Sequence, residues 1–385
     1  MVLADRGVEV TLLERQRDFA REFRGEVLLP TGLEALEQLG LGAALASVPR
    51  ARPETLELYL NRRLLLRAEA DPAFFGGRLP APLSQPALLE AIVAEGEKRS
   101  TFRFLRGAAA RDLLRGGGRV VGVRAAHDDA EIELRADLVV GADGRASVVR
   151  RRGGFEARAQ DVPMDIVWCK VPPFEPLRGA RAYVGRGHLL IAYRASDDRV
   201  QVAWAILKGT FGELRRQGVE HWVRDMAAHV SDDLGRHLLA SAGDLRHPFL
   251  LDCQADRVTR WSAPGVLLVG DAAHVMSPVG GQGLNIALRD VIAAANELVP
   301  VLRGGAAPEA IDAACARVEA ARLPEVREIQ RRQALPPRVL LQRAWWGEPA
   351  RRALAGLLRT SFGQRLALAN VAPFLFGVGD ARLRA

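Results

Sequence analysis

The amino-acid sequence predicts an α/β protein in which a Rossmann-type nucleotide-binding domain is interrupted by a second domain built on an antiparallel sheet. Strand-like and helix-like segments alternate near both ends of the chain, which is typical of a parallel sheet wound with helices. Between them, from about residue 162 to residue 208, strand-like runs follow one another through turns such as "ASDD", which is typical of antiparallel strands. We therefore assign residues 1–50, 81–160 and 263–303 to the nucleotide-binding domain, residues 51–80 and 161–262 to the second domain, and residues 304–385 to a C-terminal helical region.

The first sixteen residues, "MVLADRGVEVTLLERQ", predict the second half of a βαβ nucleotide-binding unit. "LADRG" is typical of the last turn of a helix with Gly7 as its stop, and residues 8–13 are typical of a buried strand that Glu14 closes. An acid at this strand end is a candidate ribose ligand, and the accompanying glycine fingerprint stands about 20 residues earlier. That distance reaches back before Met1, and the glycines of "RGGGRVVG" fail the required spacing. We therefore expect the gene product to begin upstream of Met1 with a strand and a glycine loop.

The elements that follow are predicted from periodicity and end signals. "TLELYLNRRLLLR", residues 55–67, predicts a hairpin, and "SQPALLEAIVAEGEK" predicts a helix with Ser84 as its N-cap and Pro86 in its first turn. The next stretch predicts short strands joined by Gly-rich and Asp-rich turns. Residues 213–242 and most of the chain from Pro308 onward predict helices.

Composition narrows the functional classes. The 385 residues are 49% hydrophobic and 26% charged, which is ordinary for a globular protein with a large core. No run of eighteen apolar residues and no signal-peptide pattern is present in this sequence, so we expect a cytoplasmic protein without a spanning helix. The three cysteines, Cys169, Cys253 and Cys315, are far apart and form no C-x-x-C pair, which argues against a disulfide framework and against a metal site.

The net charge of +8 and the isoelectric point near 10.1 raise the question of nucleic-acid binding. Nearly all the bases are arginines that alternate with acids, and lysine occurs only at positions 98, 170 and 208. No dense basic tract forms, so nucleic acid is not the expected partner. A basic surface instead favours anionic small molecules or an acidic membrane surface.

The stretch "DLVVGADGRASVVR", from Asp137 to Arg150, is the first motif with chemical content. Its hydrophobic strand runs into Gly141 and Ala142, whose small size lets the backbone approach a phosphate-bearing ligand. Asp143 can then accept hydrogen bonds from ligand hydroxyls, or cap the turn. Taken alone, the Asp-Gly pair is more typical of an ordinary turn.

The second motif is "GVLLVGDAAHVMSPVGGQGLNIALRD". A buried strand ends at Gly270, and Asp271 leaves it where a carboxylate can meet a ribityl hydroxyl. After Pro278 fixes the loop, three glycines open a helix whose free N–H groups favour negative charge, such as the N1–C2=O edge of a reduced flavin. These glycines are Gly280, Gly281 and Gly283. An ordinary strand–loop–helix connection does not explain this many specialised positions, so the motif predicts a flavin site.

With both motifs in place, the chain resembles the class A flavoprotein monooxygenases, the family of para-hydroxybenzoate hydroxylase and the ubiquinone-biosynthesis hydroxylases. The resemblance covers nearly the whole chain except the missing start, and departs from the family pattern at Ala146, where a charged residue is usual. It implies a Rossmann-type FAD-binding domain whose first strand is missing. It also implies cofactor contacts by Glu14 (adenosine ribose), Arg24 (flavin and pyrophosphate), Gln85 (flavin chain), Asp143 (FAD and nicotinamide) and Asp271 (ribityl chain). Gly270 is a further implied cofactor-binding residue. The residues expected to line the isoalloxazine are Pro278, Gly280, Gly281, Gln282, Gly283, Leu284 and Asn285.

The resemblance further implies the chemistry. NAD(P)H would reduce FAD, and a flavin C4a-hydroperoxide formed with O2 would hydroxylate an electron-rich aromatic, polycyclic or quinone-precursor substrate. Two alternatives stay open: a flavin-dependent reductase or dehydrogenase on the same fold, and a truncated non-catalytic remnant with poor FAD binding, which the absent start favours. No residue is singled out as a catalytic base, and His274 is interpreted as a packing residue near the flavin loop.

The expected partners are FAD, NAD(P)H as a transient co-substrate, and a small aromatic or lipid-like substrate. The C-terminal stretch "LALANVAPFLFGVGDARLRA" mixes apolar residues with arginine. It is interpreted as a helix packed on the flavin domain or on a partner subunit, or alternatively as an interfacial segment that contacts a membrane peripherally. We expect a monomer or a homodimer.

Overall fold

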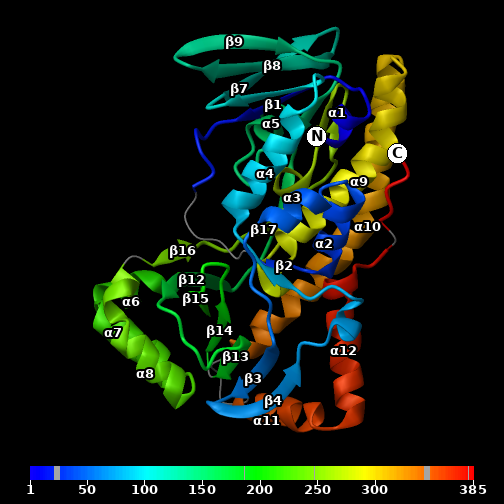
Figure 1. Ribbon diagram of the computed structural model, residues 1–385. Helices are drawn as coiled ribbons and strands as arrows, with labels where there is room; N and C mark the ends of the chain where they lie inside the picture. The colour runs from blue at the N-terminus through cyan, green and yellow to red at the C-terminus, as the bar shows by residue number, and fades with distance from the viewer. Residues whose placement is uncertain (21–26, 186, 247, 342–346, 380) are drawn as a thin grey trace.

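The computed structural model describes residues 1–20, 27–185, 187–246, 248–341, 347–379 and 381–385. It shows the mixed α/β architecture that the sequence predicts (Figure 1). Short parallel sheets and long helices make up the nucleotide-binding half, and a seven-stranded sheet makes up the other half. Segments of the two halves alternate along the chain. For example, the hairpin of residues 55–69 belongs to the seven-stranded sheet, although it precedes most of the nucleotide-binding strands.

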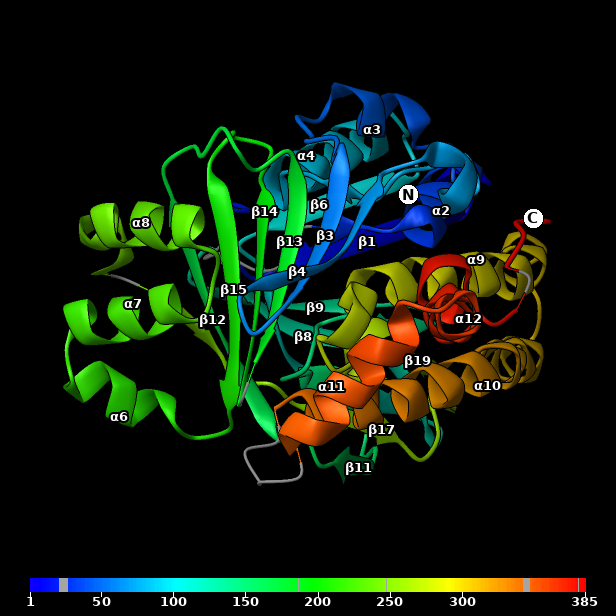
Figure 2. The same cartoon turned by 90° about the horizontal axis from the view of Figure 1, so that it is seen from below.

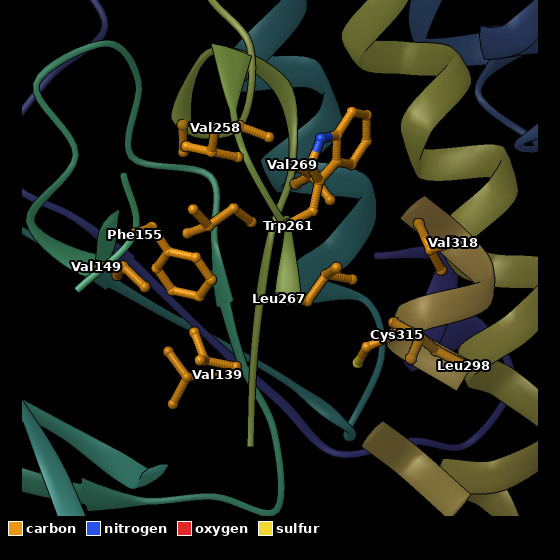
Figure 3. Packing of buried hydrophobic residues seen from close by; sticks show 14 of the residues in the cluster. Val139, Val149, Phe155, Val258, Trp261, Leu267, Val269, Leu298, Cys315 and Val318 are labelled. Carbon is orange, nitrogen blue, oxygen red and sulfur yellow. The ribbon is translucent and has the colours of Figure 1, made fainter. Parts of the chain in front are cut away.

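Two parallel strand pairs form the centre of the nucleotide-binding half. β1 (Val10–Glu14) pairs with β6 (Phe102–Arg106), and β10 (Val139–Gly141) pairs with β19 (Val266–Leu268). The short β18 (Ser262–Ala263) extends the second pair in the antiparallel direction. Figure 3 shows Leu267 of β19 between Val139 on one side and Cys315 on a helix at the other. Burial of these apolar side chains from water is the main force that holds β19 in place.

Strand β1 is less buried than the sequence predicts. Among the described residues it pairs only with β6, so one of its edges has no hydrogen-bonded neighbour in this part of the chain, and Leu12 is 42% exposed. The buried strand expected over residues 8–13 is therefore a half-exposed strand over Val10–Glu14. Leu13, which alternation places on the opposite face, still packs against the core that contains Val139.

Smaller elements complete this half. β7 (Ala109–Gly116), β8 (Arg119–His127) and β9 (Ala130–Arg135) form an antiparallel meander, β11 (Ala157–Gln160) pairs with β17 (Ala255–Val258), and β2 (Val27–Leu28) pairs with β5 (Ala81–Pro82). The helices are α1 (Val2–Asp5), α2 (Pro30–Gln38), α3 (Gly42–Ser47), α4 (Gln85–Glu97), α5 (Val148–Arg152) and α9 (Gln282–Arg303). The predicted N-cap of α4 is confirmed, because the Ser84 hydroxyl accepts a hydrogen bond from the Ala87 amide at 3.3 Å.

The seven-stranded sheet has the strand order β16-β12-β15-β14-β13-β3-β4. Its strands are β3 (Thr55–Leu60), β4 (Arg63–Glu69), β12 (Met164–Val171), β13 (Gly179–Gly185), β14 (His188–Arg194), β15 (Val200–Leu207) and β16 (Phe249–Leu251). The predicted hairpin over residues 55–67 is confirmed as β3 and β4. All neighbours are antiparallel except β13 and β3, which run in parallel and join the hairpin to the other strands.

The two faces of this sheet have different neighbours. α6 (Phe211–Arg216), α7 (Val219–Ala228) and α8 (Asp232–Ala240) cover one face, where Trp204 packs with Trp222 of α7 and Leu234 of α8 (Figure 2). The opposite face turns toward the nucleotide-binding half. Trp168 and Ala203 on that face belong to the same apolar cluster as Val279, which lies in the glycine-rich loop before α9.

The C-terminal region is helical, as the sequence predicts. α10 (Pro308–Leu340) lies along α9, and α11 (Gly347–Leu358) and α12 (Ser361–Phe376) form a helical hairpin at one end of the molecule (Figure 1). Leu375 of α12 packs with Leu29 of the nucleotide-binding half and with Phe75 of the segment after β4, so the helix is docked on both. Within the described residues, none of the helices combines the length and the apolar character that crossing a membrane requires.

The parallel contact between β13 and β3 leaves no room for a side chain at Gly179. A Cβ atom there would lie 2.0 Å from the Thr55 carbonyl oxygen, a backbone atom that cannot move without opening the sheet. We expect Gly179→Ala to lower the free energy of unfolding by about 3 kcal/mol, measured by urea denaturation. Gly243→Ala is the matched control, because a Cβ at Gly243 meets nothing within 4 Å. Equal stability of the two variants would contradict the tight approach of β13 to β3.

Candidate cofactor-binding site

The glycine-rich loop before α9 forms an open cradle. The chain leaves β19, turns at Gly270 (φ 58°), and reaches α9 through Gly280 (φ 73°) and Gly281 (φ 62°), all in the left-handed region that favours glycine. A Cβ atom on Gly281 or Gly283 would meet nothing within 4 Å, and no side chain caps the first turn of α9. The loop therefore exposes backbone and free N–H groups to whatever lies in front of the helix, which suits a flat ring with a partly negative edge.

Two buried amides fix the shape of this cradle from behind. The Asn285 Oδ1 atom accepts from the Leu29 amide at 2.9 Å, and its Nδ2 group donates to the Gly281 carbonyl at 2.8 Å. The Gln282 Nε2 group donates to the carbonyls of Gly280 and Phe374, both at 2.9 Å. Both side chains are buried and face the protein. Their hydrogen bonds tie the loop to the start of α2 and to the end of α12.

A buried carboxylate holds the other end of the loop. Asp290, on α9, accepts from the Gly270 amide at 3.0 Å, from His274 Nε2 at 2.7 Å and from Arg322 Nε of α10 at 2.8 Å. Burial alone would raise the pKa of Asp290, but His274 and Arg322 outweigh burial and lower that pKa to about 2. The carboxylate therefore stays ionised and keeps the turn at Gly270 in register with α9.

The ionic network extends from Asp290 to the C-terminal tail. Arg322 also pairs with Glu325, whose carboxylate contacts Arg289 at 3.0 Å and accepts from the Val378 amide at 3.0 Å. Burial opposes ionisation of Glu325, but the two arginines lower its pKa below the ordinary value. Two carboxylates and two guanidinium groups are thus buried together and compensate one another.

The Asp-Gly motif after β10 is also organised by its carboxylate. Asp143 Oδ2 accepts from the backbone amides of Val148 and Val149, at 2.6 and 3.1 Å, and its Oδ1 atom lies 2.5 Å from the Ser147 hydroxyl. The residue is exposed at the start of the short helix α5. Asp143 therefore caps this turn, as one of the two interpretations of the motif expects, and its exposed position leaves it accessible to a ligand.

A bridge connects the two motifs. The Arg150 guanidinium pairs with Asp256 of β17 at 3.1 Å. Asp256 in turn exchanges hydrogen bonds with the backbone of Val275, its amide donating at 3.1 Å and its carboxylate accepting at 3.2 Å. The Asp-Gly turn and the loop after Gly270 are therefore held on one frame, although about 125 residues separate them in the chain.

The remaining site residues of the prediction lie in different parts of the molecule. Glu14 ends β1, half-buried, and accepts from the Gln16 amide at 2.9 Å; Gln85 is the first residue of α4. Asp271 is half-buried in the turn after Gly270, and Pro278 and Leu284 are half-buried on either side of the glycines. The hydrogen bonds described above link the loop residues to one another and, through Arg150, to the Asp143 turn. Arg24 lies outside the described residues.

His274 has the structural role expected of it. The imidazole is fully buried and lies 4.8 Å from the Trp261 ring, with its Nε2 atom on Asp290. Sequence analysis missed the network around Asp290. The available signal was the charged pair Arg289–Asp290 on a helix whose neighbours are apolar, because buried charges in such a place require partners.

Comparison with known proteins shows the family of the chain. Residues 1–328 match the family described as FAD binding domain. The 6-methylpretetramide 4-monooxygenase of Streptomyces rimosus is 31% identical over 98% of this chain and 88% of its own length. The 3-demethoxyubiquinol 3-hydroxylase of Escherichia coli is 25% identical over 77% of this chain and 75% of its own length.

Solved structures share the fold. PqsL, described as a probable FAD-dependent monooxygenase from Pseudomonas aeruginosa, superposes with a TM-score of 0.73 over 89% of this chain and 92% of its own, at 24% identity. The p-nitrophenol 4-monooxygenase of Pseudomonas putida gives a TM-score of 0.76 over 97% and 94%, at 17% identity.

The chain is a flavoprotein, an oxidoreductase of the monooxygenase class with FAD as its cofactor. It belongs to the FAD binding domain family, and the resemblance inferred from the two motifs is confirmed.

The Asp290 network predicts a measurable loss on neutralisation. We expect Asp290→Asn to lower the free energy of unfolding by about 3–5 kcal/mol at pH 7, because the two buried arginines, Arg289 and Arg322, are then left with the single carboxylate of Glu325. The exposed Asp129→Asn is the control.

The pH dependence follows from the lowered pKa of Asp290. Because this pKa is depressed in the folded state, the stabilising contribution of the carboxylate is present above the ordinary value of 3.8 and is lost as the pH falls toward 2. The stability gap between the native chain and Asp290→Asn should therefore narrow between pH 4 and pH 2. A gap that stays constant over this range would contradict the assignment.

Proposed function

We propose that this enzyme uses NAD(P)H and O2 to hydroxylate an electron-rich aromatic substrate of polycyclic or quinone-precursor type in the cytoplasm. The observation that carries the proposal is the cradle at Gly281 and Gly283, where an added Cβ atom would meet nothing within 4 Å among the described residues, and which adjoins the apolar face of the seven-stranded sheet through Val279. A flat cofactor in the cradle would face a flat substrate on the sheet. The relatives include a 6-methylpretetramide 4-monooxygenase and a 3-demethoxyubiquinol 3-hydroxylase, and these activities support the proposed substrate class.

The residues of the two motifs fit the cofactor. We propose that Gly270, Asp271, Pro278, Gly280, Gly281, Gln282, Gly283, Leu284 and Asn285 form the flavin side of the site, and that Asp143, Glu14, Gln85 and Arg24 serve the rest of FAD and the transient NAD(P)H. When bound, FAD supplies the redox chemistry with O2. The N-terminal amides of α9 stabilise negative charge in front of the helix, and Asn285 and Gln282 act from behind by holding those amides in place.

The sheet supplies the wall of the substrate site. The face of the sheet that packs against Val279 carries aromatic and branched side chains, among them Trp168, Ile191 and Tyr193. Such a wall binds a flat apolar ring and keeps water from the reacting atoms. The chain contributes position and water exclusion, and no catalytic base is assigned.

Oxygen transfer separates the proposal from a reductase or dehydrogenase on the same fold. The FAD-loaded full chain is incubated with NAD(P)H, 18O2 and candidate phenols and quinone precursors. We expect substrate-stimulated NAD(P)H consumption and one 18O atom in each product molecule, detected by mass spectrometry. NAD(P)H consumption whose organic product lacks 18O would favour the reductase instead.

Gly283 offers a test of the cradle itself. Alanine at this helical position should raise the free energy of unfolding of the FAD-free chain by about 0.5–1 kcal/mol, because alanine is the better helix former and its Cβ meets no protein atom. We also expect Gly283→Ala to weaken FAD binding at least about tenfold, because the methyl group enters the space where the ring packs on the backbone.

Flavin fluorescence quenching measures the affinity. Gly356→Ala is the control, since its Cβ is equally unobstructed but it lies in α11, away from the loop. Unchanged FAD affinity in Gly283→Ala would remove this loop from the site.

A further inference from the structure

Gln201 is a buried polar residue whose hydrogen-bonding capacity is not used. It has 0% exposure, and neither its Nε2 nor its Oε1 atom has a hydrogen-bond partner in the part of the chain that the structure describes. A buried amide costs free energy when its donors and acceptor are unpaired, which is why such groups in native proteins point to a function or to a missing ligand. The network around the cofactor loop does not involve this residue.

The position of Gln201 places it on the wall of the substrate site. Alternation along β15 puts Val200 and Val202 on the face covered by α6–α8, and Gln201 with Ala203 on the opposite face. Gln201 lies directly across from Tyr193 of β14 and from Lys170 of β12. The amide is therefore part of the same face as the apolar cluster that contains Val279.

The neighbours of Gln201 are suited to a flat ring. Ala203 and Ala205 follow it along β15 on the same face, and their small side chains project only a short distance from the sheet. Trp168 lies opposite Ala203 on β12, and Tyr193 lies opposite Gln201 on β14. Trp168 and Ile191 thus lie on either side of Ala203, and Lys170 and Tyr193 lie on either side of the primary amide.

We propose that Gln201 is a specificity-determining residue that recognises an aromatic ligand through an edge carrying a hydrogen-bond donor beside an acceptor. A primary carboxamide, or a hydroxyl next to a carbonyl, presents such an edge. The Gln201 Nε2 group donates to the ligand acceptor, and its Oε1 atom accepts from the ligand donor. This assignment rests on the proposed function, because it uses the same substrate wall, and it narrows the substrate class from electron-rich aromatics to those with a paired polar edge.

Two ligands of nearly equal shape test the pairing. 2-Naphthamide carries a donor and an acceptor, and 2-acetonaphthone carries only the acceptor. We expect the full-length native chain to bind the naphthamide about tenfold more tightly than the acetonaphthone, measured by isothermal titration calorimetry without turnover. Gln201→Met, which keeps the length of the side chain and removes its polar atoms, should reduce this ratio to about one or below.

Controls separate recognition from folding. Gln254→Met makes the same change at an exposed site outside this face, and should keep the tenfold ratio. Gln201→Met and Gln201→Leu should unfold at or above the temperature of the native chain in the absence of ligand, because the unpaired amide has been removed. Equal affinity of the native chain for both naphthalenes, or an unchanged ratio in a folded Gln201 variant, would overturn the assignment. Because binding is measured without NAD(P)H or O2, a failure of the oxygen-transfer experiment leaves this result readable on its own.

Discussion

The hydrogen bonds of the Asp290 carboxylate are the interaction on which the cofactor site depends. One buried side chain reaches the turn after β19, the imidazole of the same loop and a guanidinium of α10. Replacing it by an apolar residue would leave Arg322 with only Glu325, which it shares with Arg289, and the Gly270 amide without this acceptor, so the loop and both long helices are coupled through a single group. This carboxylate fixes the start of the loop at Gly270, so the loop does not need side-chain packing at its glycines to keep its position.

The side-chain amides of Asn285 and Gln282 hold the end of the loop that adjoins α9. Asn285 binds the start of α2 and Gln282 binds the end of α12, so segments from near the beginning and near the end of the chain meet behind the glycines. The same close approach explains why Gly32 is a glycine: a Cβ atom there would lie 2.1 Å from Asn285 Oδ1. Because these hydrogen bonds fix the loop from the protein side, its other side can consist of glycine backbone alone and still keep one shape, as a preorganised site requires.

Local signals in the sequence were sufficient to predict the helices and strands and the family. They were not sufficient to predict which partners the buried polar groups have. The N-cap Ser84, the hairpin at residues 55–67 and the glycine opening of α9 depend on neighbours in the chain, so they could be predicted. The pairing of Asp290 with Arg322 joins two helices, and no periodicity specifies it. Exposure of Leu12 was also not predictable, because the apolar run at residues 8–13 indicates a buried strand while burial depends on which strands stand beside it.

The two faces of β15 differ in composition, and under the proposed function one face serves stability and the other serves recognition. Along β15, the residues Val200, Val202, Trp204 and Ile206 pack under α6–α8, and they form a continuous apolar surface that needs no ligand. The alternate positions carry one amide, two alanines and, at the end of the strand, Leu207; the amide and the alanines bury little apolar area and contribute little to folding. A sheet selected for stability alone would have branched side chains on both faces, as parallel and sandwiched strands usually do. Under the proposed function this contrast has a physical reason, because small side chains and one polar contact on this face are what a flat substrate with a polar edge would need.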